Sequence, residues 1–335
     1  MKTKFHFAGI ILLVQFILIL NGFSANPDTG GVPTVTEART FKSCLLPAPK
    51  NGGFQMDGYC IWCSSVVKVG DTYNMFASRW PAKYGLNGWL NYSECVRATS
   101  KDLLGPYTFQ EVVLQKRAGH WDAPRVHNVK VVQIGSQYVI FYISTANSTG
   151  YAFADSVTGP WTRSDQAVMK FSNPAPFVRP DLSIYCFGRL KDKDQVNRGV
   201  AATAPNFKGP YTMVDSGANL LPGGYELEDP TIWWANNQYN VLMTDWKGKA
   251  TGTVKAGVQY FSKDGIQYQL MSHDPVFTKT VTYDDHTTET FARRERPQVY
   301  TNEKGEVIAL FTACLPKNGP SRVVVQPVDH YYPGN

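Results

Sequence analysis

Residues 225–234 read Tyr225-Glu226-Leu227-Glu228-Asp229-Pro230-Thr231-Ile232-Trp233-Trp234, so carboxylates stand directly before an apolar run. A turn and a second apolar run, residues 239–243, follow. This order predicts a β-hairpin whose first strand begins with polar residues. Similar polar starts precede apolar runs at His127-Asn128, at Asn173-Pro174 and at Arg294-Glu295-Arg296-Pro297. If such hairpins surround an axis, their polar starts meet at one place.

A turn of the form Gly-Pro-aromatic-Thr repeats along the chain. It occupies residues 105–108, 159–162 and 209–212, and a degraded copy, Gly-Ile-Gln-Tyr, stands at 265–268. The four turns lie 54, 50 and 56 residues apart, a period typical of repeated β architectures. Each repeat reads as three strands, this turn and an outer strand, and a ring of such four-stranded sheets is a β-propeller.

We therefore predict an all-β fold, a five-bladed β-propeller. The predicted inner strands start near Trp62, Asn128, Asn173, Asp229 and Arg296. A composition of 43% hydrophobic, 13% aromatic and only 18% charged residues, with 28 Gly and 21 Pro, favours a turn-rich β chain. A β-sandwich is the alternative, but a sandwich does not need a repeated turn. The sequence has no long segment with helical periodicity and no Gly-rich phosphate loop, so it does not indicate nucleotide chemistry.

The first residues have the pattern of a secretory signal. Lys2 and Lys4 precede an apolar run over 10–20, and small residues follow up to Ala25. The run is shorter than the roughly 20 apolar residues that span a bilayer, so we expect no membrane span. We predict a signal peptide over 1–25, an extended lead-in over 26–50 and the propeller over 51–335. The protein should then be secreted or periplasmic.

Charge and cysteine content limit the other partners. The formal net charge is +6 and no long Lys/Arg run is present, so we expect no nucleic acid partner, and we expect a monomer. Six cysteines in an exported chain permit disulfides, among them a Cys44–Cys314 bridge that would close a ring. Cys60 and Cys63 lack the second pair that a zinc site needs. A structural Ca²⁺ would suit a central channel, but no calcium-loop motif is present, so we predict no metal and no cofactor.

Acidic residues near separate strand starts suit the cleavage of a glycosidic bond. One carboxyl group must protonate the leaving oxygen while another activates water or attacks the anomeric carbon. The candidate catalytic residues are Asp57, Glu228, Asp122 and Glu295. Each has a structural alternative: a turn at Asp57, an exposed rim position at Glu228, a loop cap at Asp122, and an ion pair at Glu295, which stands among three arginines.

A carbohydrate is the expected partner, because hydroxyls bind to polar strand starts and sugar rings stack on aromatic side chains. The candidate substrate-binding residues are His127, Asn128, Trp121, Asn173, Asp229 and Arg296. Trp121 stands next to Asp122 and is the first choice among the tryptophans. Most tryptophans of a β protein belong to the core, and His127 could equally be a buried, hydrogen-bonded histidine.

As a set, these motifs resemble the five-bladed glycoside hydrolases of families 43, 32, 62 and 117. The resemblance covers nearly the whole chain after residue 50 and is carried by Ser93-Glu94-Cys95-Val96-Arg97-Ala98, Gly105-Pro106-Tyr107, His127-Asn128, Asn173-Pro174-Ala175-Pro176, Glu228-Asp229-Pro230 and Arg294-Glu295-Arg296-Pro297. It departs from family 43 in the first blade, where Trp62-Cys63-Ser64 replaces an Arg-Asp-Pro-like phrase that carries the general base. His127-Asn128 replaces a common Asp-Pro, and Asn173-Pro174 stands where the acid Glu is sought. The resemblance to family 117 implies an acid role for His127.

We therefore expect a secreted glycoside hydrolase, exo-acting on plant or algal polysaccharide, with Asp57 as base and Glu228 as acid. A carboxyl separation of about 6.5–9.5 Å would indicate inversion and one of about 5–5.5 Å retention. Two alternatives remain open. One is a non-catalytic carbohydrate-binding propeller. The other is a polysaccharide lyase acting on uronic acids, in which Arg296 neutralises the substrate carboxylate and His127 or a tyrosine abstracts the proton.

Overall fold

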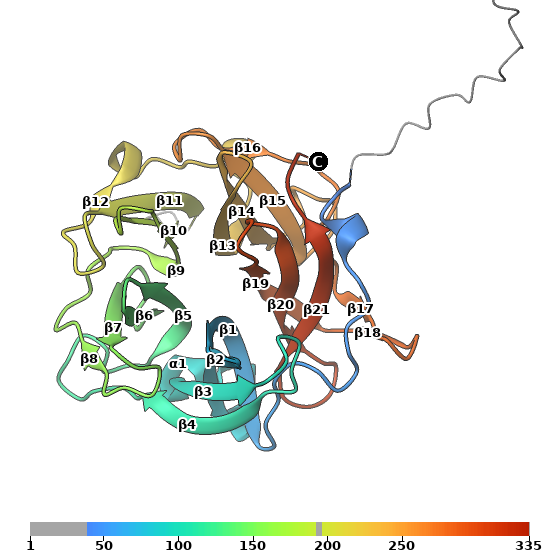
Figure 1. Ribbon diagram of the computed structural model, residues 1–335, viewed down its shortest axis with the longest axis horizontal. Helices are drawn as coiled ribbons and strands as arrows, with labels where there is room; N and C mark the ends of the chain where they lie inside the picture. The colour runs from blue at the N-terminus through green and yellow to red at the C-terminus, as the bar shows by residue number, and fades with distance from the viewer. Residues whose placement is uncertain (1–38, 192–195, 335) are drawn as a thin grey trace, which may run out of the picture. The chain divides into compact units, whose positions relative to one another are not determined.

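The computed structural model describes residues 39–334 apart from 192–195, and within these ranges the chain forms a five-bladed β-propeller. Five innermost strands, β1, β5, β9, β13 and β19, surround the centre (Figure 1). The period of the turns had predicted this fold, and the prediction is confirmed. The expected signal peptide and the first part of the lead-in lie outside the described residues. In the part of the chain that is described, no helix is long and apolar enough to cross a membrane.

The blades follow the chain in order, and each is an antiparallel sheet. Blade 1 contains β1 (Tyr59–Val69), β2 (Thr72–Pro81), β3 (Glu94–Ser100) and β4 (Thr108–Leu114). Blade 2 contains β5 (His127–Ile134), β6 (Gln137–Ile143), β7 (Thr149–Ala154) and β8 (Thr162–Arg163). Blade 3 contains β9 (Ser172–Val178), β10 (Ile184–Lys191), β11 (Asn197–Ala204) and β12 (Thr212–Met213). Blade 4 contains β13 (Leu227–Ala235), β14 (Gln238–Asp245), β15 (Ala256–Ser262) and β16 (Gln269–Leu270).

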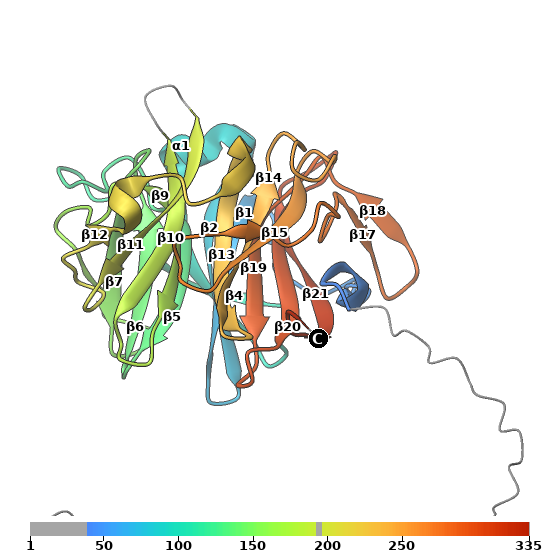
Figure 2. The ribbon, with the colours of Figure 1, turned by 90° about the horizontal axis from the view of Figure 1, so that it is seen from above.

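Blade 5 contains β19 (Arg293–Thr301), β20 (Val307–Leu315) and β21 (Arg322–Tyr331), and a separate hairpin of β17 (Thr280–Thr282) and β18 (Thr288–Thr290) precedes it. Helical structure in the described residues is confined to short turns (Figure 2). The turns are α1 (Trp89–Tyr92) and the 3-10 segments Lys42–Cys44, Ala82–Tyr84, Leu86–Gly88, Val214–Gly217 and Pro222–Gly224.

The repeated turns fold as their sequence suggests. Gly105-Pro106, Gly159-Pro160 and Gly209-Pro210 each have a cis peptide bond and lead into the outer strands β4, β8 and β12. In the first and third copies the tyrosine hydroxyl donates a hydrogen bond to the carbonyl four residues earlier, at 2.9 Å for Tyr107 and 3.0 Å for Tyr211. The turn residues therefore fix where each outer strand begins.

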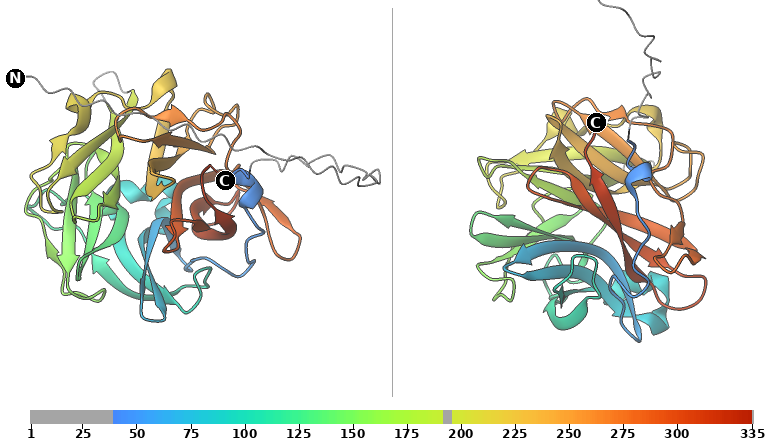
Figure 3. Two further views of the ribbon diagram at one scale, coloured as in Figure 1. Left: turned by 45° about the horizontal axis from the view of Figure 1, so that its top comes forward. Right: turned by 45° about the vertical axis from the view of Figure 1, so that its right-hand side comes forward.

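The chain closes the ring by pairing its beginning with its end. Phe54 and Val323 exchange backbone hydrogen bonds of 3.1 and 2.9 Å, and the Leu46 amide donates to the Pro327 carbonyl at 3.0 Å. The described part of the lead-in thus runs beside β21 (Figure 3). It supplies blade 5 with the outer partner that the other blades obtain from their own fourth strand. Apolar clusters fill the space between consecutive blades, so the core is divided among the five interfaces.

The expectation of a Cys44–Cys314 disulfide is wrong for this structure, in which all six cysteines are buried and free. Cys44 packs with Phe41 and Trp233, whereas Cys314 belongs to a different cluster with Tyr283 and Phe291. The two thiols therefore lie in separate parts of the core.

Candidate active site

Each inner strand presents one side chain to the propeller axis from a left-handed backbone. These five residues are Cys63, Asn128, Asn173, Asp229 and Arg296, with φ values of 53°, 54°, 55°, 63° and 59°. In every blade the register of strand pairing shifts at this point, as in a β-bulge, and a bulge redirects a side chain. We call these five residues the axial ring. Left-handed backbone at a non-Gly residue costs on the order of 1 kcal/mol, and such strain tends to cluster at functional sites.

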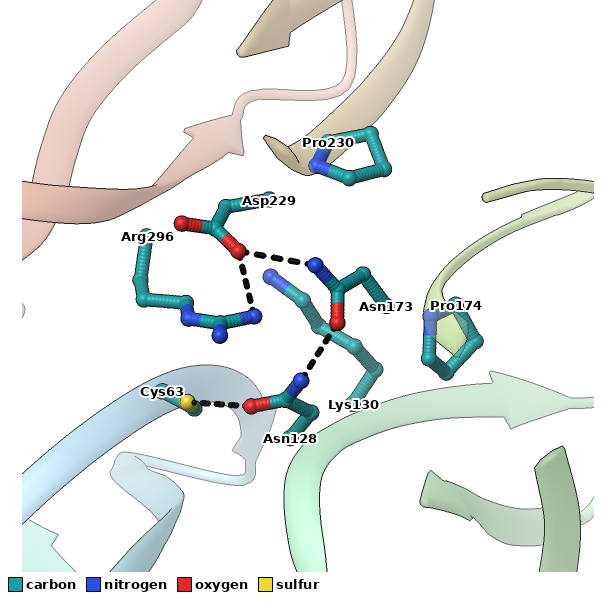
Figure 4. Close-up of a pocket in the computed structure, with 8 residues that line it drawn as sticks. All are labelled: Cys63, Asn128, Lys130, Asn173, Pro174, Asp229, Pro230 and Arg296. Atoms are coloured by element: carbon teal, nitrogen blue, oxygen red, sulfur yellow. Dashed lines mark hydrogen bonds and ion pairs between the residues drawn. The ribbon is translucent and has the colours of Figure 1, made fainter. Parts of the chain in front are cut away.

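Hydrogen bonds and one ion pair join the axial ring around the centre (Figure 4). The Cys63 Sγ–H donates to Asn128 Oδ1 at 2.8 Å, Asn128 Nδ2 donates to Asn173 Oδ1 at 2.5 Å, and Asn173 Nδ2 donates to Asp229 Oδ1 at 2.9 Å. Arg296 Nη1 then lies 2.5 Å from the same Asp229 oxygen. Burial raises the pKa of Cys63 to about 12, which keeps its thiol protonated as this arrangement requires.

Burial also changes the ionisation of the charged groups at the axis. It raises the pKa of Asp229 to about 7, even though the Arg296 guanidinium opposes this shift. It lowers the pKa of Lys130, whose ammonium group donates to Gln298, to about 8. The cavity enclosed by the ring and Lys130 has a volume of about 10 Å³, which is room for about one water. The axial cavity is therefore too small to hold a sugar ring.

Two carboxylates precede the axial ring at matching positions in neighbouring blades. Glu228 stands directly before Asp229 in β13, and Glu295 stands directly before Arg296 in β19. Asn197 Nδ2 donates to Glu228 Oε1 at 2.9 Å, while the Glu228 side chain remains 16% exposed. Glu295 is more enclosed, with its side chain 3% exposed.

Cations lie beside both of these carboxylates. Arg189 Nε is 3.9 Å from Glu228 Oε1. Lys255 Nζ is 2.8 Å from Glu295 Oε1, and Arg293 Nη1 is 3.7 Å from the same oxygen. Each of the two glutamates thus directly precedes a residue of the axial ring, and each has a cationic neighbour.

His127 precedes the ring in blade 2, but it is buried beneath aromatic side chains. Its ring stacks on Trp89 with centroids 4.6 Å apart, and Nδ1 lies 2.8 Å from Ser93 Oγ. The Ser93 hydroxyl donates its proton to the Val126 carbonyl, so His127 Nδ1 carries the proton of the pair. Burial, with help from Arg296 and Arg125, holds the pKa of His127 well below its usual value, which makes it a neutral imidazole.

Comparison with known proteins identifies the fold and not the sequence family. No protein-family model matches the chain, and no curated protein matches its sequence. Among solved structures, the family 117 glycoside hydrolase Zg3597 of the marine bacterium Zobellia galactanivorans has a TM-score of 0.62 and 14% identity, covering 85% of this chain and 89% of that chain. This protein has the fold of the five-bladed glycoside hydrolases.

Two further solved structures support that assignment. A GH43 β-xylosidase/α-arabinofuranosidase from a compost microbial metagenome has a TM-score of 0.60 and 12% identity, covering 84% of this chain and 95% of that chain. An endo-arabinase from Bacteroides thetaiotaomicron has a TM-score of 0.58 and 14% identity, covering 82% of this chain and 96% of that chain. The similarity therefore extends over nearly the whole propeller in each case.

The remaining residues predicted for the site lie away from the axial ring of this glycoside hydrolase fold. Asp57 is in an exposed turn ahead of β1 and six positions before Cys63. Asp122 is buried, with its carboxylate 3.0 Å from Arg117 Nε and 2.9 Å from the Tyr142 hydroxyl. Neither carboxylate precedes its ring residue directly, as Glu228 and Glu295 do.

Trp121 belongs to the packing around that buried aspartate. Its indole stacks on Tyr142 with centroids 5.1 Å apart, and Nε1 donates to the Ser164 carbonyl at 3.0 Å. The structure therefore holds Trp121 with core residues at the interface of blades 1 and 2.

Sequence reasoning missed several side chains that line the axis or its mouth. Cys63 and Lys130 enclose the axial cavity, while Arg189, Asn197 and Lys255 contact the two glutamates. Cys63 could have been found by aligning it with Asn128, since both stand just before apolar runs. Arg189 and Lys255 are near the ends of second and third strands, and no local motif marks them. In the described residues, no group of His, Cys, Asp and Glu side chains could hold a metal ion.

Proposed function

We propose that this protein is a glycoside hydrolase in which Glu228 and Glu295 are the two catalytic carboxylates. The observation that carries this proposal is their matched position, one residue before the axial ring in adjacent blades, in a fold shared with glycoside hydrolases. Glycosidic cleavage needs two carboxyl groups on either side of the scissile bond. Both residues were candidates from the sequence. Glu295 takes the place of Asp57 as the partner of Glu228, because Asp57 lies in the exposed turn before β1.

We assign the proton-donor role to Glu228. Within the described residues, Asn197 and Arg189 both approach Glu228 Oε1, so Oε2 is the oxygen that we assign to carry the proton. Glu228 is also the more exposed of the two glutamates, as a group that must reach the glycosidic oxygen should be. In the reaction the leaving oxygen takes this proton as its bond to the anomeric carbon breaks.

We assign the role of base or nucleophile to Glu295. Lys255 and Arg293 lie beside its Oε1 and stabilise a negative charge there. As a base, Glu295 would accept a proton from the water whose oxygen bonds to the anomeric carbon. As a nucleophile, its oxygen would form that bond first, and water would then release the sugar.

The finer parts of the proposal concern location and substrate. Lys2, Lys4 and the apolar run over 10–20 support export. Exo-action on plant or algal polysaccharide is a further part of this proposal, and comparing the products released from long and short oligosaccharides tests it. The named activities of the xylosidase/arabinofuranosidase and the arabinase support testing xylo- and arabino-oligosaccharides first.

The test is release of reducing sugar from a panel of plant and algal oligosaccharides and aryl glycosides. Glu228→Gln and Glu295→Gln should each lower kcat by roughly 10²- to 10⁴-fold, the usual contribution of acid–base catalysis. Asp57→Asn is the matched control and should keep nearly full activity. Glu228→Gln should lose less on aryl glycosides with good leaving groups, which need little proton donation. Loss of activity in Asp57→Asn, or full activity in either glutamine variant, would contradict the assignment, provided that circular dichroism and thermal melting show each variant to be folded.

A carbohydrate-binding propeller without catalysis is the second candidate. The observation that favours it is that cations lie near Glu228, Asp229 and Glu295 alike, as they would around carboxylates with a structural role. Glycan binding without any cleavage would support this candidate. Products that absorb in the ultraviolet, formed by elimination without adding a water molecule across the cleaved bond, would instead indicate a polysaccharide lyase.

A further inference from the structure

Among the described residues, positive charge exceeds negative charge around the two glutamates. Within that part of the chain, the carboxylates Glu228, Asp229 and Glu295 lie close to the cations Arg189, Lys255, Arg293 and Arg296. All seven belong to one electrostatic neighbourhood, because Asp229 interacts with Arg296, Arg189 and both glutamates, and Lys255 interacts with Arg293, Glu295 and Asp229. The buried ammonium of Lys130 lies against the axial ring and adds to the positive side. The mouth of the axis is therefore a cationic site and not a balanced set of ion pairs.

Two of these cations have only long contacts with the carboxylates. Arg189 Nε is 3.9 Å from Glu228, and Arg293 Nη1 is 3.7 Å from Glu295, both beyond hydrogen-bonding distance. Among the described residues, Arg189 Nε is a buried nitrogen without a hydrogen-bond partner. The Arg293 side chain is 39% exposed. An arginine in this state has donors left for a ligand, and guanidinium groups bind carboxylates and sulfates through paired hydrogen bonds.

The two arginines lie beside different glutamates. Arg189 comes from β10 of blade 3 and lies beside Glu228, whereas Arg293 comes from β19 of blade 5 and lies beside Glu295. Trp246 fixes the second group, because Lys255 Nζ lies 2.7 Å and the Arg293 guanidinium 5.7 Å from the centroid of its ring. A ligand that reaches both glutamates would therefore come close to both arginines.

We infer that the ligand of this site is an acidic carbohydrate, in which an anionic group on the sugar, a uronic carboxylate or a sulfate ester, binds to Arg189 and Arg293. The location of the ligand rests on the proposed function, since it assumes that Glu228 and Glu295 face the sugar. The buried Arg189 Nε lacks a hydrogen-bond acceptor among the described residues, and an anionic group would satisfy it more strongly than a neutral hydroxyl, which favours anionic over neutral glycans.

The experiment compares glycans that differ only in charge. The probes are oligogalacturonate and its methyl ester, and a sulfated galactan oligosaccharide and its desulfated form. Binding to immobilised glycans and release of reducing sugar are measured separately, with wild type, Arg189→Gln, Arg293→Gln and the control Arg179→Gln. Arg179 follows β9, at the opposite end of its strand from Asn173, and donates to the Tyr239 hydroxyl.

We expect one of the anionic probes to bind at least tenfold more tightly than its neutral partner, and this preference should fall with added salt. Arg189→Gln and Arg293→Gln should each remove most of the preference, while Arg179→Gln should keep it. The probe that shows the preference distinguishes a carboxylate from a sulfate. Equal binding of charged and neutral partners, or binding of neither pair, would overturn the inference.

The two readouts separate this inference from the proposed function. Anionic glycans that bind selectively without being cleaved would support the inference and contradict the hydrolase assignment. Cleavage of neutral glycans with no preference for charge would support the hydrolase and overturn the inference.

Discussion

Replacing Arg296 by Gln should make the stability of the protein depend on pH in a way that wild type does not. Burial raises the pKa of Asp229 to about 7 in the presence of Arg296, whose guanidinium lies 2.5 Å from the carboxylate and favours the ionised form. Without that cation the pKa of Asp229 should rise further, towards the value of about 8–9 documented for buried carboxyl groups. Above pH 7, folded wild type would then have released a proton that the folded variant still holds.

The size of the effect follows from this difference of one proton. The unfolded state has an ionised Asp229 throughout this range, so a folded state that keeps its proton loses about 1.4 kcal/mol of stability for each pH unit. Between pH 7 and pH 9, Arg296→Gln should therefore lose roughly 1–2 kcal/mol relative to wild type, in addition to a constant loss at lower pH. The measurement is urea unfolding of both proteins from pH 5 to pH 9.

Two control variants isolate the pair. Arg39 and Asp329 are also 2.5 Å apart, but their side chains are 48% and 57% exposed, so Arg39→Gln should show no such pH dependence. Adding Asp229→Asn to Arg296→Gln removes the titrating group and should abolish the extra slope. A difference between Arg296→Gln and wild type that stays constant from pH 6 to pH 9 would refute the reasoning.

Two further predictions concern buried groups near the site. The pKa of His127 lies well below its usual value, so the unfolded state binds a proton that the folded state does not, and stability should fall by about 1.4 kcal/mol per unit as pH drops below about 6.5. His127→Gln should remove this part of the acid slope in urea unfolding, and the exposed His120→Gln should leave it, whereas equal slopes in all three proteins would contradict the assignment. A Cβ at Gly150 would lie 2.1 Å from Trp121 Cζ2, so Gly150→Ala should lower the free energy of unfolding by about 1–3 kcal/mol. An unchanged stability would show that Trp121 is not packed as described.

The fold could be predicted from the sequence because its signals are local and repeat. The Gly-Pro-aromatic-Thr turns set the period, and polar residues before apolar runs marked the inner strands at Asn128, Asn173, Asp229 and Arg296. In blade 1 the predicted start at Trp62 is one residue before the ring residue Cys63. Hydrophobic periodicity locates a strand without fixing where its bulge falls, and this explains the difference of one position.

The site was predictable only in the part that belongs to the inner strands. Glu228 and Glu295 could be selected because each adjoins a strand start. Arg189 reaches Glu228 from the second strand of blade 3, and Lys255 reaches Glu295 from the turn before the third strand of blade 4. Contacts of that kind depend on how strands pair and not on any local motif. Asp57 and Asp122 show the opposite case, because both are near a predicted strand start, yet one lies in an exposed turn and the other pairs with Arg117 and Arg163.

The most direct test of the hydrolase assignment is to follow the oxygen of water. Oligosaccharides from the panel are incubated with wild-type protein in water enriched in ¹⁸O, reduced at once to prevent exchange, and analysed by mass spectrometry. We predict one ¹⁸O atom at the new reducing end of each cleaved product, and formation of this product by Glu228→Gln that is slower by roughly 10²- to 10⁴-fold. Cleavage without incorporation of ¹⁸O, or binding of the oligosaccharides with no cleavage at all, would contradict it.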